Sequence, residues 1–166
     1  MSQSRTTVVR WDVGELLELI DSGIEHCRAG RWEKGADDLG YVAERNDGDL
    51  SQAGLYLSYL GCAIARVQNR QKEALVLCEH AVKVEFYQPE NWANLAEVLL
   101  LLDNRREAIK ALLRGLRFDP QDERLLELSE RLGMRRLPIL GFLGRSNPLN
   151  HLLGRLRSDI LGSRRR

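Results

Sequence analysis

The sequence predicts an all-α protein made of three consecutive helical hairpins and a closing helix. Three observations support this prediction. Apolar residues recur at the three- and four-residue spacing of an amphipathic helix over most of the chain. Paired helical patterns repeat at a step of 34 residues. Small residues stand at matching places in these pairs, where two helices that cross closely leave little room for a side chain.

The clearest hairpin runs from Asn91 to Pro120. Its first helix places four residues on one face: Trp92, Leu95, Ala96 and Leu99. Asp103 and Asn104 then interrupt the helical pattern. The second helix carries a face of its own: Ala108, Leu112, Gly115 and Leu116. It is expected to end at Asp119, because the residue before a proline disfavours helical geometry.

The preceding hairpin follows from the 34-residue step. Counting back from Glu107, Ala108, Leu112 and Gly115 reaches Glu73, Ala74, Cys78 and Ala81. In its first helix, however, Leu60 and Gly61 are one residue out of step. This offset predicts that its connecting turn is one residue longer than the turn of the third hairpin.

The first hairpin shows the weakest pattern. Gly35 lies 39 residues before Ala74, five more than the repeat step, and the polar stretch from Asn46 to Gly54 is the expected place of the insertion. Asp12 and Glu15 form a predicted capping box for the first helix, and Trp11 before them is expected to pack on that helix. A closing helix is predicted from Gln121 to Gly133.

These units resemble the tetratricopeptide repeat, whose pattern is W-x2-L-G-x2-Y…A-x3-F…P. The third unit fills the pattern in order, with Ala in place of Gly and Leu in place of both aromatics, whereas the second has Phe86 where proline is usual. The resemblance implies an α-solenoid domain over residues 12–134, preceded by an N-terminal segment, 1–11. Its repeats would span about 16–49, 54–87 and 89–122, with a capping helix at 121–133.

In this family the first helices of the repeats line a concave face that binds peptides. The resemblance places nine residues there: Ile20, Ile24, Tyr59, Cys62, Arg66, Glu90, Asn94, Glu97 and Leu101. One use of the family is a clamp of Lys, Arg and Asn on the C-terminal carboxylate of a heat-shock chaperone. The matching places here are Ile20, Ile24, Tyr59, Glu90 and Asn94, so this clamp is not expected. The expected ligand is an apolar or basic peptide or helix; the alternative is a merely solvated face.

The C-terminal extension, residues 135–166, does not continue the repeat. Residues 1–130 hold 16 Lys and Arg against 23 Asp and Glu, whereas residues 131–166 hold nine Arg and one acid. Asn147 and Pro148 predict the start of a short amphipathic helix after an extended segment. The residues expected to make its contacts are Phe142, Arg145, Asn147, Leu149, Leu152, Leu153 and Leu156.

Three places are open for this arm. It folds back on the acidic body of its own chain, docks on a partner protein or a second copy, or lies on a membrane surface with its C-terminal arginines at the headgroups. RNA is less favoured, because aromatic residues do not alternate with the basic ones. No DNA partner is expected.

The sequence shows no motif for catalysis, a cofactor or a metal. Its three histidines are scattered, and its three cysteines include no Cys-x-x-Cys pair. An odd number of cysteines within helical pattern indicates reduced thiols of a cytoplasmic protein. We therefore expect a non-enzymatic protein-interaction module: an adaptor, scaffold or complex subunit. The alternatives are a chaperone resembling the type III secretion chaperones built from these repeats, or a regulatory subunit of an enzyme or membrane-associated complex.

Overall fold

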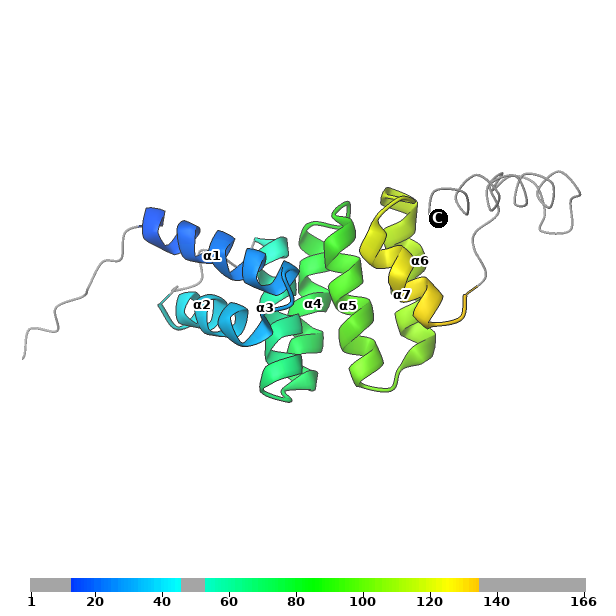
Figure 1. Cartoon of the computed structure of the whole chain (residues 1–166), viewed down its shortest axis with the longest axis horizontal. Helices are drawn as coiled ribbons and strands as arrows, with labels where there is room; N and C mark the ends of the chain where they lie inside the picture. The colour runs from blue at the N-terminus through cyan, green and yellow to red at the C-terminus, as the bar shows by residue number, and fades with distance from the viewer. Residues whose placement is uncertain (1–12, 46–52, 135–166) are drawn as a thin grey trace, which may run out of the picture. The chain divides into compact units, whose positions relative to one another are not determined.

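The computed structural model of the chain describes residues 13–45 and 53–134. These residues form seven α-helices and no strand, which confirms the predicted all-α class (Figure 1). In chain order they are α1 (Val13–Arg28), α2 (Trp32–Arg45), α3 (Gly54–Val67), α4 (Gln71–Val84), α5 (Pro89–Leu101), α6 (Arg105–Phe118) and α7 (Glu123–Arg131). Trp11 and Asp12 of the predicted capping arrangement, most of the insertion and the whole C-terminal arm lie outside the described residues, whereas Glu15 lies in the first turn of α1. None of the described helices is both long enough and apolar enough to span a bilayer.

The chain divides into two compact units, Met1–Leu128 and Ser129–Arg166. The described part of the second unit contains the end of α7. There Gly133 adopts a left-handed conformation with φ of 61°, and the Met134 N–H donates to the Ser129 carbonyl at 2.9 Å. This is the usual way in which a glycine closes a helix C-terminus.

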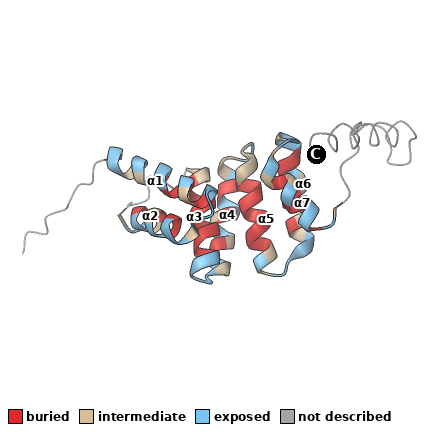
Figure 2. Cartoon of the chain, viewed as in Figure 1, coloured by how far each residue is buried: buried red, intermediate tan, exposed pale blue. Residues whose placement is uncertain are grey.

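The first unit is built from adjacent helix pairs. α1 packs on α2, α3 on α4 and α5 on α6, while α3 and α5 also contact the neighbouring hairpin. Because α3 and α5 have neighbours on several sides, they carry long buried runs, residues 56–65 and 91–99. Figure 2 shows these runs as the most continuously buried stretches of the helices.

The turns that join the two helices of each hairpin share one backbone feature. Gly30, Asn69 and Asp103 each adopt a positive φ, of 76°, 56° and 56°, directly between the two helices of a pair. The turns 68–70 and 102–104 have the same length, so the prediction of a longer turn in the second hairpin is wrong.

A small residue is required where α3 and α4 pack closely together, and Gly61 occupies this point. A Cβ there would lie 2.9 Å from the Ala74 carbonyl oxygen.

Candidate binding surfaces

Five of the nine residues predicted to line the concave face belong to one network of polar side chains: Tyr59, Arg66, Glu90, Asn94 and Glu97. Arg28 and Arg124 complete it. The surface over this network is termed the first-helix face, and it is defined by the partly exposed Arg28, Arg66, Glu90 and Arg124, with Tyr59 and Glu97 buried beneath them. Ile20 and Ile24 are buried in the core, and the buried Cys62 thiol donates to the Glu97 carboxylate at 3.5 Å. Leu101 is 42% exposed at the end of α5.

Glu90, in the first turn of α5, forms one half of the network. Arg28 grips its carboxylate with two hydrogen bonds, from Nε at 3.0 Å and Nη2 at 2.7 Å, and the Tyr59 hydroxyl donates to it as well. Arg28 also donates to Glu25, at 2.6 Å. Burial alone would raise the pKa of Glu90, but the hydrogen bonds from Arg28 and Tyr59 outweigh it and hold the pKa below its usual value.

Glu97, two turns further along α5, forms the other half. Arg66 of α3 pairs with one carboxylate oxygen, and Arg124 of α7 donates to the other at 3.0 and 3.2 Å. Burial would raise the pKa of Glu97, yet Arg124 and Arg66 together keep it lowered. Arg124 also donates to the Tyr59 hydroxyl oxygen at 3.4 Å, which joins the two halves.

A buried series of hydrogen-bonded neutral side chains lies beneath the charged network and holds it in place. The Ser58 hydroxyl donates to the Asn91 amide oxygen at 2.7 Å and accepts from the Asn94 amide at 3.0 Å. Asn91 in turn donates to the Glu85 carbonyl at 3.2 Å, and Asn94 accepts from Arg124 at 2.7 Å. These fully satisfied groups hold α3 and α5 in one register, so the charged side chains above them are pre-positioned.

The sequence interpretation missed Arg28 and Arg124. Both carry a signal in retrospect. Arg28 follows Ile24 by four residues and therefore shares its helix face. A 34-residue step from Glu90 reaches Arg124, so the closing helix occupies the place of a fourth first helix. The interpretation treated α7 only as a cover for the last repeat.

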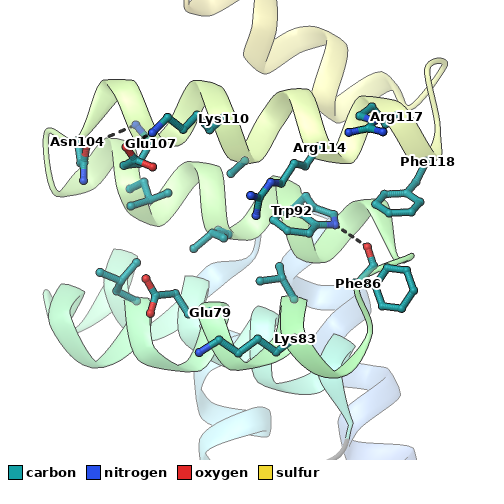
Figure 3. A pocket seen from close by; sticks show the side chains of 15 residues that line it. Glu79, Lys83, Phe86, Trp92, Asn104, Glu107, Lys110, Arg114, Arg117 and Phe118 are labelled. Atoms are coloured by element: carbon teal, nitrogen blue, oxygen red, sulfur yellow. Dashed lines mark hydrogen bonds and ion pairs between the residues drawn. The ribbon is translucent and has the colours of Figure 1, made fainter.

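A second surface lies between the second helices. A groove of about 1030 Å³ runs between α4 and α6, with α5 beneath it (Figure 3). It is termed the second-helix groove and is lined by Leu75, Glu79, Val82, Lys83, Phe86, Trp92, Leu95, Leu99, Asn104, Glu107, Lys110, Ala111, Arg114, Arg117 and Phe118. None of the nine residues predicted for the concave face, all of which the structure describes, lines this groove.

The three cysteines, Cys27, Cys62 and Cys78, are free thiols buried in the core. Burial raises the pKa of Cys27 to about 11 and that of Cys62 to about 12, so both are protonated at neutral pH. Over residues 13–45 and 53–134, no group of three or more His, Cys, Asp or Glu side chains is arranged to hold a metal ion.

The sequence matches no protein-family model, and no curated protein matches it. Solved structures do resemble it. The first tetratricopeptide domain of Spaghetti (RPAP3), bound to the HSP90 peptide SRMEEVD, is 15% identical, with a TM-score of 0.57 over 75% of this chain and 95% of that one. The type III secretion translocator chaperone SycD of Yersinia enterocolitica, in an alternative dimer, is 17% identical, with a TM-score of 0.52 over 74% of this chain and 89% of that one.

The adjacent hairpins and the similarity to these solved structures define the class of fold, which is that of a helical repeat protein. Within that class the chain has the fold of tetratricopeptide repeat domains, as its residue pattern predicted. At identities of 15% and 17%, the likeness concerns the fold.

Proposed function

We propose that this protein is a non-catalytic interaction module that binds a peptide or helix of a partner protein at its first-helix face. The observation that carries the proposal is the charged network itself. Four helices supply three arginines, two glutamates and a tyrosine to one network. Arg28, Arg66, Glu90 and Arg124 are its partly exposed members, and Tyr59 and Glu97 are buried beneath them. Preformed polar groups of this kind fix the orientation of a bound segment at little cost in side-chain entropy.

A basic or apolar segment suits this face. Glu90 is the more accessible carboxylate, with its side chain 25% exposed against 9% for Glu97. Its partner Arg28 is 40% exposed and already bonds to Glu25. A cation of the partner that replaces Arg28 therefore leaves neither Glu90 nor Arg28 unpaired. The exposed Leu101, eleven residues along α5, offers an apolar contact on the same stripe.

The test is capture of partners from a native cytoplasmic lysate with the full chain, followed by mass spectrometry. We expect one stoichiometric protein whose capture falls at least about tenfold with Glu90→Gln, because an interfacial charge pair is lost. Glu33→Gln is the matched control, since Glu33 is also an acid in the first turn of a helix. Equal loss in both variants, or capture unaffected by Glu90→Gln, contradicts the proposal.

A second candidate is a chaperone for unfolded clients, which the likeness to SycD favours. The same capture experiment separates the two. Many sub-stoichiometric clients, bound in competition with a generic unfolded protein, indicate a chaperone. A single enzyme or membrane complex recovered at equal stoichiometry indicates a regulatory subunit.

A further inference from the structure

The second-helix groove has an apolar floor that is held in place. Trp92, Leu95 and Leu99 of α5 form this floor, each 6% exposed. The Trp92 indole N–H donates to the Phe86 carbonyl at 2.7 Å, which fixes the ring across the groove (Figure 3). All of these residues belong to the unit Met1–Leu128. An apolar side chain that enters the groove therefore meets a rigid apolar surface and is removed from water.

An exposed aromatic cluster closes one end of the groove. Phe86, Tyr87 and Phe118 are 56%, 61% and 45% exposed. The Phe86 ring contacts Tyr87 and Phe118 edge-on, with ring centroids 5.8 and 5.9 Å apart. Three large aromatics exposed together, next to an apolar groove, are typical of the anchor region of a protein interface.

The rim of the groove is positively charged. Lys83, Arg114 and Arg117 line it, and within the described part of the chain none of them forms an ion pair with a carboxylate. Lys110 and Glu107 neutralise each other at 2.7 Å. Glu79 is then the remaining acidic residue of the groove lining, whereas Lys83, Arg114 and Arg117 are three basic residues of the same lining. The rim therefore attracts a negatively charged segment.

We propose that the second-helix groove binds an acidic, amphipathic segment of a partner protein. Its large apolar side chains contact the floor and the aromatic cluster, and its carboxylates pair with Lys83, Arg114 and Arg117. The C-terminal part of the chain itself is a poor occupant, because residues 131–166 carry nine Arg and one Asp and meet like charge at the rim. A phosphate backbone is less suited than a peptide, because the floor is apolar and both Glu79 and Glu107 line the groove.

The experiment selects ligands from a random peptide library displayed on phage, with the full chain as bait. Selected peptides are labelled and their affinities are measured by fluorescence anisotropy. We expect sequences rich in Asp and Glu with aromatic or aliphatic anchors. Lys83→Glu combined with Arg117→Glu should weaken their binding by at least about tenfold, because two attractive charge contacts become repulsive. Phe118→Ala should weaken it similarly without any change of charge.

A matched control separates local contacts from net charge. Lys72→Glu combined with Arg106→Glu changes the same two helices by the same charge, at exposed positions outside the groove. This variant should bind within about twofold of the unmodified protein. Circular dichroism and thermal melts verify that each variant folds, since a Glu in the last turn of a helix opposes its dipole.

Each result of the peptide selection and of the affinity measurements either supports the proposal or overturns it. The proposal is overturned if no peptide is selected, if the selected peptides are basic or neutral, or if the two charge-reversal pairs weaken binding equally. It is also overturned if labelled oligouridylate binds more tightly than the peptides and loses affinity with Lys83→Glu and Arg117→Glu. Glu90→Gln should leave these peptides unaffected, so a failure at this groove is distinguishable from a failure of the first-helix face.

Discussion

At the scale of single residues, Glu97 illustrates how a buried charge becomes essential to its surroundings. It is 8% exposed and lies between Arg66 and Arg124. Glu97→Ala should lower the free energy of unfolding by about 3 kcal/mol, because two partly buried guanidinium groups then lose their counter-ion. Urea denaturation measures the change. Glu44→Ala, at an exposed acid beside Arg45, is the control and should change stability by less than about 0.5 kcal/mol.

A second residue-scale prediction compares two glycines with open space around them. A Cβ at Gly30 or at Gly40 would meet no other atom within 4 Å, but only Gly30 has a positive φ. Gly30→Ala should destabilise the protein by about 1 kcal/mol, because a left-handed conformation strains an L-residue. Gly40→Ala, inside α2, should stabilise it by about 0.8 kcal/mol through helix propensity. Thermal melts that move in the same direction for both variants would contradict this explanation.

At the scale of helices, the second and third hairpins differ in how their second helix begins. Arg70 and Asn104 precede α4 and α6 with nearly equal backbone angles, φ −91° and ψ 55° against φ −91° and ψ 62°. Asn104 caps α6 by accepting from the Glu107 N–H, whereas Arg70 makes no side-chain cap. The fold therefore tolerates an uncapped helix where tertiary contacts already hold it in place.

This difference predicts a stabilising substitution. Arg70→Asn should raise the free energy of unfolding by about 0.5–1 kcal/mol, because the backbone already has the geometry of the capped position. Asn104→Ala, at the equivalent place in the third hairpin, should lower it by about 1 kcal/mol. Chemical denaturation of the two variants measures both changes. An Arg70→Asn variant that is less stable than the parent would show that its pairing with Glu73 outweighs the cap.

At the scale of the whole molecule, the charged network ties α1, α3, α5 and α7 together and makes stability depend on pH. The pKa values of Glu90 and Glu97 are lowered below the ordinary value of 4.5, so the folded protein holds fewer protons than the unfolded chain near that pH. Stability from these two groups is complete above pH 4.5 and is lost as the pH falls through their folded-state pKa values.

The expected result is a fall in the denaturation midpoint as the pH drops below about 4.5. Urea titrations across this range measure it. Glu97→Gln should flatten the dependence, because one of the two titrating carboxylates is removed, although the variant is less stable at neutral pH. A variant with an unchanged pH slope would show that other carboxylates dominate the acid response.

The sequence by itself determined the helices, their pairing into hairpins and the class of fold. Local signals carry this information: an apolar face every three to four residues, polar breaks such as Asp103 and Asn104, and small residues such as Gly61 where helices approach. A 34-residue period then repeats these signals, so each unit corroborates the others.

Only the tertiary structure decided which of the predicted face residues are accessible and what neutralises them. Ile20, Ile24 and Cys62 share a helix face with groove positions of the repeat pattern, but neighbouring helices bury them. Arg28 and Arg124 reach Glu90 and Glu97 from helices that are distant in sequence. The helix face and the repeat step indicate where these arginines lie, but they do not specify which acid each arginine pairs with. The second-helix groove was likewise not predictable. Its lining comes from three helices whose separate apolar faces are typical of an ordinary core. Only their packing leaves Phe86 and Phe118 exposed beside Lys83 and Arg117, which form no ion pair with any residue that the structure describes.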